Sequence, residues 1–101
     1  MKSIGELVDH IYEELDDAES YAELAIECST DDRQLAETYI SISKEEINHM
    51  NRLHDQITRL IQDKKNQGIE IPQGMQEIYD YEHKKIIKKA AEVQLVISSY
   101  K

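Results

Sequence analysis

The sequence contains few of the residues that interrupt helices or cross-link chains. Its 101 residues include three glycines, one proline and one cysteine, and neither tryptophan nor phenylalanine. A single cysteine, Cys28, excludes an internal disulfide and a thiolate metal cage, so we expect a reduced thiol. With 40% hydrophobic and 33% charged residues, this composition is typical of long helices. We therefore expect one all-α domain.

Basic residues are also scarce, mainly in the first half of the chain. Residues 1–50 hold 14 acids and 3 bases, and residues 51–101 hold 7 acids and 9 bases, so the halves carry −11 and +2 and sum to the net charge of −9. A duplex-binding surface needs clustered lysine and arginine, so this balance argues against nucleic acid as a partner. The basic run is read as the solvated face of a helix; it comprises Lys84, Lys85, Lys88 and Lys89.

Long hydrophobic runs are absent as well. Acidic residues such as Glu6, Asp9 and Glu13 interrupt the first fifteen residues, where a signal peptide would need an apolar segment. No run approaches the roughly 20 apolar residues that span a bilayer. We therefore expect a cytoplasmic protein that has no membrane contact.

Hydrophobic residues recur at helical spacing in three stretches. The predicted helices cover about residues 4–28, 31–66 and 73–100. A capping box from Ser3 to Glu6 opens the first, and a second box from Asp31 to Gln34 opens the next. Pro72 marks the connection before the third helix. The sequence thus predicts a three-helix antiparallel chain.

Ionisable residues interrupt the hydrophobic stripe of the second predicted helix. The stripe consists of Leu35, Tyr39, Ile42, Glu46, His49 and Leu53. Glu46 and His49 therefore stand where core residues are expected, and burying a charge is costly unless it is paired or bound to a metal. Their i, i+3 spacing places a carboxylate and an imidazole on one helical face. Two metal ligands and a polar pair at a helix seam are the alternatives.

The first predicted helix offers two acids, Glu14 and Glu19, that are each flanked by hydrophobic residues at helical spacing. If the chain folds back near residues 30 and 31, Glu14 lies level with residue 47, between Glu46 and His49. Glu19 lies level with residue 42, which is most of two turns away at about 1.5 Å per residue. This counting favours Glu14 as the third ligand, with a solvated surface acid as the alternative.

These residues resemble part of a known family. Glu14 with Tyr21 and Ala25, followed one helix later by Glu46 and His49, resembles the first half of a rubrerythrin- or bacterioferritin-type ferritin-like domain. The resemblance implies a di-iron site with Glu14 as a terminal ligand, Glu46 as a bridging ligand and His49 as a terminal imidazole ligand. It further implies a ferroxidase-type oxidoreductase that oxidises ferrous iron with oxygen or peroxide. Manganese and zinc accept the same ligands.

The chain departs from that family in length. Ferritin-like domains have four helices with a second Glu-x-x-His segment on the last, and this chain lacks both, as well as the cysteine pairs of a rubredoxin module. The full ligand set is four Glu and two His, which two copies of this chain would supply. We therefore expect a homodimer or higher homo-oligomer with the metals at a two-fold interface, as in small half-ferritins such as the encapsulated ferritins.

The sequence leaves two alternatives open. Glu82 interrupts the third hydrophobic stripe between Tyr79 and Ile86, so it is a candidate ligand or supporting group within the same chain, or else a polar seam residue. A metal-free helical assembly or adaptor protein is the alternative function, because many short acidic helical chains belong to that class. The remaining histidines are expected on the surface; they are His10, His54 and His83.

Overall fold

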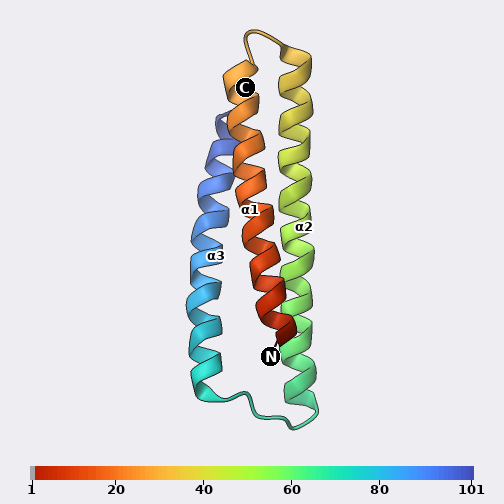
Figure 1. The fold of residues 1–101 in the computed structure, drawn as a ribbon, viewed down its shortest axis with the longest axis vertical. Coiled ribbons are helices and arrows are strands. Elements are labelled where there is room, and N and C mark those ends of the chain that lie inside the picture. Colours follow the sequence, from red (N-terminus) through yellow and green to blue (C-terminus); the bar gives the residue numbers. More distant parts are fainter. Residues whose placement is uncertain (1) are drawn as a thin grey trace.

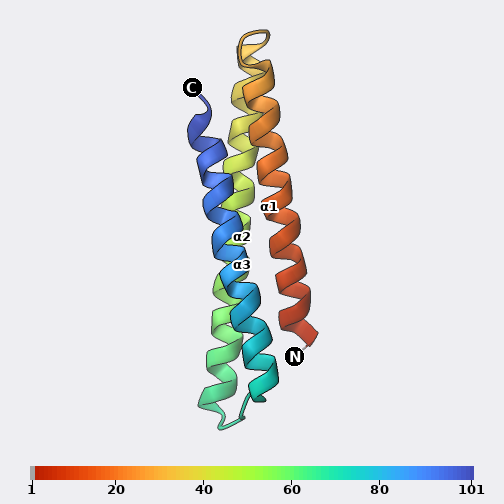
Figure 2. The same cartoon turned by 90° about the vertical axis from the view of Figure 1, so that its left-hand side faces the viewer.

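The computed structural model describes residues 2–101, which form three antiparallel helices (Figure 1). They are α1 (Lys2–Cys28), α2 (Arg33–Asn66) and α3 (Gln73–Ser99). Figures 1 and 2 together place the three axes at the corners of a triangle. Residues 2–101 contain no strand, so the prediction of an all-α chain with three helices is confirmed. None of the helices in this range is long and apolar enough to cross a membrane.

Two of the predicted helix starts are displaced by a residue or two. Helix α1 begins at Lys2, so Ser3 lies inside the helix and does not occupy the capping position. At α2 the capping residue is Asp32 rather than Asp31, and its carboxylate accepts a hydrogen bond from the Leu35 N–H at 3.1 Å. The cap satisfies one of the backbone donors that the first turn of a helix leaves unpaired.

The connection between α2 and α3 reverses the chain through Gly68. Its φ of +75° is a left-handed conformation that glycine adopts without steric cost. The N–H groups of Gly68 and Ile69 donate to the carbonyls of Lys65 and Lys64, both at 3.0 Å, and so close the end of α2. Pro72 then precedes α3, which returns alongside α1.

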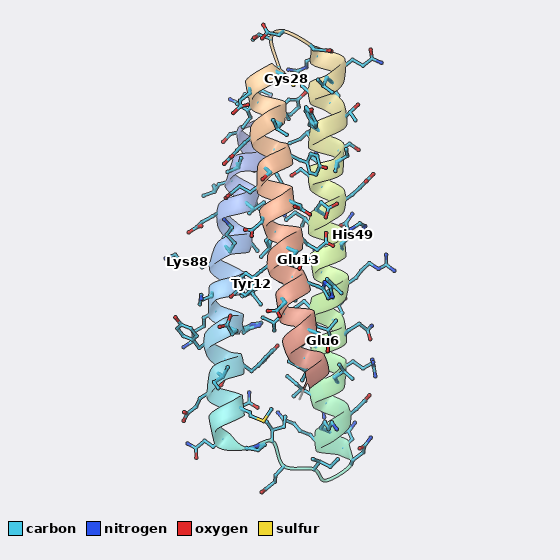
Figure 3. All side chains as sticks on the ribbon, in the orientation of Figure 1. Glu6, Tyr12, Glu13, Cys28, His49 and Lys88 are labelled. Atoms are coloured by element: carbon cyan, nitrogen blue, oxygen red, sulfur yellow. The ribbon has the colours of Figure 1, made fainter. Side chains whose placement is uncertain are left out.

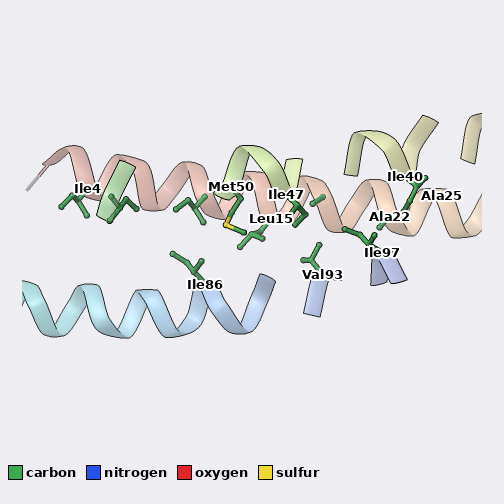
Figure 4. Packing of buried hydrophobic residues seen from close by; sticks show 13 residues of the cluster. Ile4, Leu15, Ala22, Ala25, Ile40, Ile47, Met50, Ile86, Val93 and Ile97 are labelled. Carbon is green, nitrogen blue, oxygen red and sulfur yellow. The ribbon is translucent and has the colours of Figure 1, made fainter. Parts of the chain in front are cut away.

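The core lies along the line where the three helices meet. Figure 4 shows Leu15 of α1, Ile47 of α2 and Val93 of α3 pointing into this shared space. On α2 the buried positions alternate in steps of four and three, as in coiled coils. They are Ala36, Ile40, Ser43, Ile47, Met50 and, seven residues further, Ile57. The Ser43 hydroxyl donates to the Ala18 carbonyl, which satisfies the one buried polar side chain of this stripe.

The hydrophobic stripe predicted for α2 is therefore not the core of the chain. It is a second apolar face beside the core: Leu35 is 40% exposed, and Tyr39, Ile42 and Leu53 are half-buried. The prediction that Glu46 and His49 replace core residues is wrong in this respect. Both lie at the edge of the core, on the seam between α1 and α2.

The hydrophobic face of α3 is only partly buried. Ile86, Val93 and Ile97 are buried, whereas Met75 is 37% and Ile78 is 65% exposed. Helix α3 packs mainly against α1 and makes few contacts with α2. The outer seam between α1 and α2 thus stays free of α3 (Figure 1).

Candidate metal centre

Three predicted ligands meet on the seam between α1 and α2. Glu14 comes from α1, and Glu46 and His49 come from successive turns of α2; we call these three residues the α1–α2 cluster. One ligand atom from each side chain lies within 4.8 Å of the other two. His49 Nδ1 is 3.5 Å from Glu14 Oε2 and 3.9 Å from Glu46 Oε2. Figure 3 shows His49 beside α2, away from α3.

The cluster is partly shielded from water. The side chains of Glu14, Glu46 and His49 are 25%, 18% and 49% exposed, so the carboxylates lie inside and the imidazole lies at the rim. Glu14 Oε2 is itself buried and has no hydrogen-bond partner among the described residues. A buried carboxylate oxygen without a hydrogen-bond donor loses its hydration and gains no hydrogen bond in exchange. A bound cation would supply the missing interaction.

The two carboxylates interact strongly with each other. Hydrogen bonding to Glu14 is the largest cause that raises the pKa of Glu46 to about 7, and burial and the charge of Glu14 raise it further, while His49 opposes the shift. Like charges this close disfavour double ionisation, so near neutral pH the pair retains a proton. A divalent cation between the oxygens can take the place of that proton.

The cluster borders a shallow hollow on the molecular surface. The hollow has a volume of about 380 Å³ and is lined by Glu14, His49, Arg52, Leu53 and Gln56. Protein groups from α1 and α2 therefore surround only one side of the cluster. A metal held there would have further coordination positions that face outward.

The fourth predicted ligand lies elsewhere. Glu82 accepts a hydrogen bond of 2.7 Å from the Tyr12 hydroxyl, on the side of α1 that faces α3. Burial, with this hydrogen bond as the second cause, raises the pKa of Tyr12 to about 12. Tyr12 and Glu14 are two residues apart, so they point to opposite sides of α1 at about 100° per residue. The structure does not bring Glu82 to the other three predicted ligands.

Two neighbouring predictions can be compared with the structure. Glu19 was not predicted to be a ligand, because it lies too far along the hairpin from Glu46 and His49. It forms an ion pair with Lys89 at 3.0 Å between α1 and α3. Lys89 is only 27% exposed, so the prediction of a fully solvated basic run is wrong at this position. The ion pair and the Tyr12–Glu82 hydrogen bond both fix α3 to α1.

Two histidines expected on the surface are half-buried instead. His54 Nε2 of α2 lies 3.1 Å from His83 Nδ1 of α3, while His10 is exposed as expected. A signal for His54 was available, because it falls between Met50 and Ile57 in the four-and-three spacing of the buried stripe. The stripe predicted to be the core, from Leu35 to Leu53, does not contain His54.

No protein-family model matches the chain, and no curated protein and no solved structure matches it. The class of protein therefore has to be described from the fold and the cluster alone. It is a three-helix chain that carries a carboxylate–imidazole cluster on an uncovered helix seam.

Proposed function

We propose that this chain is a ferritin-like metal-binding protein that holds iron at Glu14, Glu46 and His49. The observation that carries the proposal is the buried, unpartnered Oε2 of Glu14 within 4.8 Å of ligand atoms from a second carboxylate and an imidazole. Mixed carboxylate and imidazole ligands suit iron and manganese, and they also bind zinc.

The second half of the site comes from a second copy of the chain. One chain offers two carboxylates and one imidazole, and a two-fold dimer doubles them to the full set of a di-iron site. The half-exposed apolar residues Tyr39, Ile42 and Leu53 lie on the same face of α2 as Glu46 and His49, where a partner would cover them. Helix α3 packs on the other side of α1 and leaves this face accessible.

Iron bound in pairs supplies electrons for the reduction of oxygen or peroxide, so the activity that follows is oxidation of ferrous iron. The charges of the ligand residues suit this role. Glu14 and Glu46 provide the negative charge that favours a more highly charged ion, and Glu46 gives up the proton that it holds near neutral pH. His49, at the exposed rim, provides a neutral imidazole nitrogen.

A metal-free assembly or adaptor protein is the second candidate function. It is favoured by the exposed hydrophobic residues on the outer face of α3, where Ile87 is 54% and Leu95 is 70% exposed. Neither residue borders the α1–α2 cluster. The two functions differ in whether a metal bound at the α1–α2 cluster stabilises the folded protein.

Anaerobic addition of Fe(II) to the purified protein, followed by air, tests the proposal. We expect a di-ferric absorbance that saturates at about two irons per dimer, the stoichiometry of the ligand set. Replacing Glu46→Ala or His49→Ala should abolish it. Glu45→Ala is the matched control, because Glu45 is exposed and adjacent to Glu46 but outside the cluster.

Thermal unfolding separates the two functions. At a metal concentration about a hundredfold above the dissociation constant, binding stabilises the folded state by roughly 2.7 kcal/mol. Wild type and Glu45→Ala should show this gain with Fe(II), whereas Glu46→Ala should not. A silent spectrum and an unchanged melt with Fe(II), Mn(II) and Zn(II) would contradict metal binding and favour the assembly protein.

A further inference from the structure

The half-buried histidines His54 and His83 face each other across the space between α2 and α3. Their ring centroids are 5.0 Å apart, their planes differ by 28°, and the facing nitrogens are 3.1 Å apart. His54 stands in the buried spacing between Met50 and Ile57, and His83 stands one turn before the buried Ile86. Two polar rings therefore interrupt the cores of two helices at one level. We call them the α2–α3 histidine pair.

A hydrogen bond alone would stabilise the fold less than two apolar side chains at these positions could. Two neutral imidazoles share one N–H···N bond, in which one ring donates and the other accepts. Leucines at the same two positions would bury more apolar surface without polar groups to satisfy. The separation of the two nitrogens is, however, also one that two ligands of a shared ion can have.

We propose that His54 and His83 form a second metal site, which holds a divalent late transition-metal ion such as Zn²⁺, Ni²⁺ or Cu²⁺ between α2 and α3. Two imidazole nitrogens bound about 2.0–2.1 Å from one ion, at angles of about 90–109°, are about 2.8–3.4 Å apart. The observed separation of 3.1 Å falls in this range. Imidazole favours these ions over Mg²⁺ and Ca²⁺, which prefer oxygen ligands.

Water completes the coordination of the ion. Among residues 2–101, only the α1–α2 cluster assembles three or more His, Cys, Asp or Glu side chains within ligand distance. The α2–α3 histidine pair therefore supplies two ligands, and the remaining positions are open to solvent molecules. Metal binding also moves the proton of the donating imidazole to its other ring nitrogen, so the pair loses no proton overall.

The surroundings of His54 favour the neutral form of its imidazole. Burial is the first cause that lowers the pKa of His54, the charge of His83 lowers it further, and Asp55 opposes both. A neutral imidazole keeps the lone pair that a metal needs. Tyr79 lies next to the pair, with its ring centroid 5.8 Å from that of His83, and shields one side.

An ion at this position would join the two helices that are least connected. Helices α2 and α3 make few contacts with each other, whereas each packs well against α1. The site is independent of the proposed iron centre, because it uses other residues and lies between other helices. Its effect should be to tie α3 to α2.

The test uses a background with Glu46→Gln and His49→Ala, which disables the α1–α2 cluster. In this background one equivalent of Cu²⁺ should give an electron paramagnetic resonance spectrum with hyperfine coupling to two imidazole nitrogens. Zn²⁺ at about a hundredfold over its dissociation constant should raise Tm by roughly 10 °C. Both effects should vanish in His54→Leu and in His83→Leu. The exposed His10, replaced as His10→Leu, is the matched control.

The leucine variants should fold, since leucine suits a buried helical position, and circular dichroism checks this. Coupling to two nitrogens that persists in both variants would overturn the proposal. So would the absence of any Zn²⁺ or Cu²⁺ effect in the background, because the pair would then be only a hydrogen bond between helices. The iron experiment on wild type is unaffected by either outcome.

Discussion

Glu14 and Glu46 place two acids where the metal-free fold accommodates only one full negative charge. Hydrogen bonding to Glu14, burial and the charge of Glu14 raise the pKa of Glu46 to about 7, and the buried Oε2 of Glu14 has no hydrogen-bond donor among the described residues. Such a pair destabilises the fold unless a proton or a cation lies between the oxygens. The residues thus link the proposed function to a measurable dependence of stability on pH.

The metal-free protein should lose stability through this pair as pH rises. A carboxyl with a folded-state pKa of about 7 and an ordinary value of 4.5 binds its proton more tightly when folded. Its contribution is complete below pH 4.5 and is lost as pH passes 7. The whole shift corresponds to roughly 3 kcal/mol, and solvent at the rim of the cluster reduces this to about 1 kcal/mol.

Urea unfolding between pH 5 and pH 8 measures this loss. Glu46→Gln resembles the protonated carboxyl, so it should match wild type at pH 5 and exceed it by about 1 kcal/mol at pH 8. Glu45→Gln, at an exposed position, should follow wild type throughout. Parallel curves for wild type and Glu46→Gln would show that Glu46 has an ordinary pKa.

Which of the predicted ligands lie close together could be predicted only in part from the sequence. Glu14 meets Glu46 and His49 because the short break after Cys28 forms a tight hairpin, for which counting residues at 1.5 Å each is sufficient. Glu82 could not be placed in this way. The connection from residue 67 to 72 sets the height and rotation of α3, and no periodicity encodes either quantity.

At the scale of the helix, α2 has two apolar faces, and only one is the core. Sequence periodicity favoured the face with the larger side chains, from Leu35 to Leu53, whereas the structure buries Ala36, Ile40 and Ser43. The reason lies in α1, whose buried residues include Ala18, Ala22 and Ala25. Small side chains on both helices permit close approach, and this pairing depends on two segments that a single periodicity does not compare.

The cap of α2 gives a prediction for this element. Asp32→Ala should destabilise the protein by about 1 kcal/mol, because the Leu35 N–H loses the acceptor that lies 3.1 Å away. Asp31→Ala is the matched control and should stay within about 0.5 kcal/mol of wild type. Chemical unfolding of the three proteins measures the difference. Equal losses for both variants would mean that the charge of the loop, rather than the cap, stabilises the start of α2.

At the scale of the whole molecule, the chain is a thin rod. It measures 57 × 18 × 17 Å and has a radius of gyration of 16.5 Å, whereas a compact domain of this length has about 13 Å. Three helices in a rod leave one side of the α1–α2 pair without a covering helix. The half-exposed apolar face of α2 and the α1–α2 cluster share that side, so dimerisation and metal binding should depend on the same surface.

Leu35→Lys should therefore weaken the proposed dimer and the proposed iron site together. Leu35 is 40% exposed on this face, outside the cluster. A two-fold interface contains the substituted side chain twice, so the loss should reach roughly 2 kcal/mol, or about thirtyfold in the dimer dissociation constant. Leu95→Lys, on the outer face of α3, is the control that should leave mass and iron stoichiometry unchanged. Sedimentation with iron analysis measures both quantities, and a Leu35→Lys monomer that still binds two irons would refute the shared site.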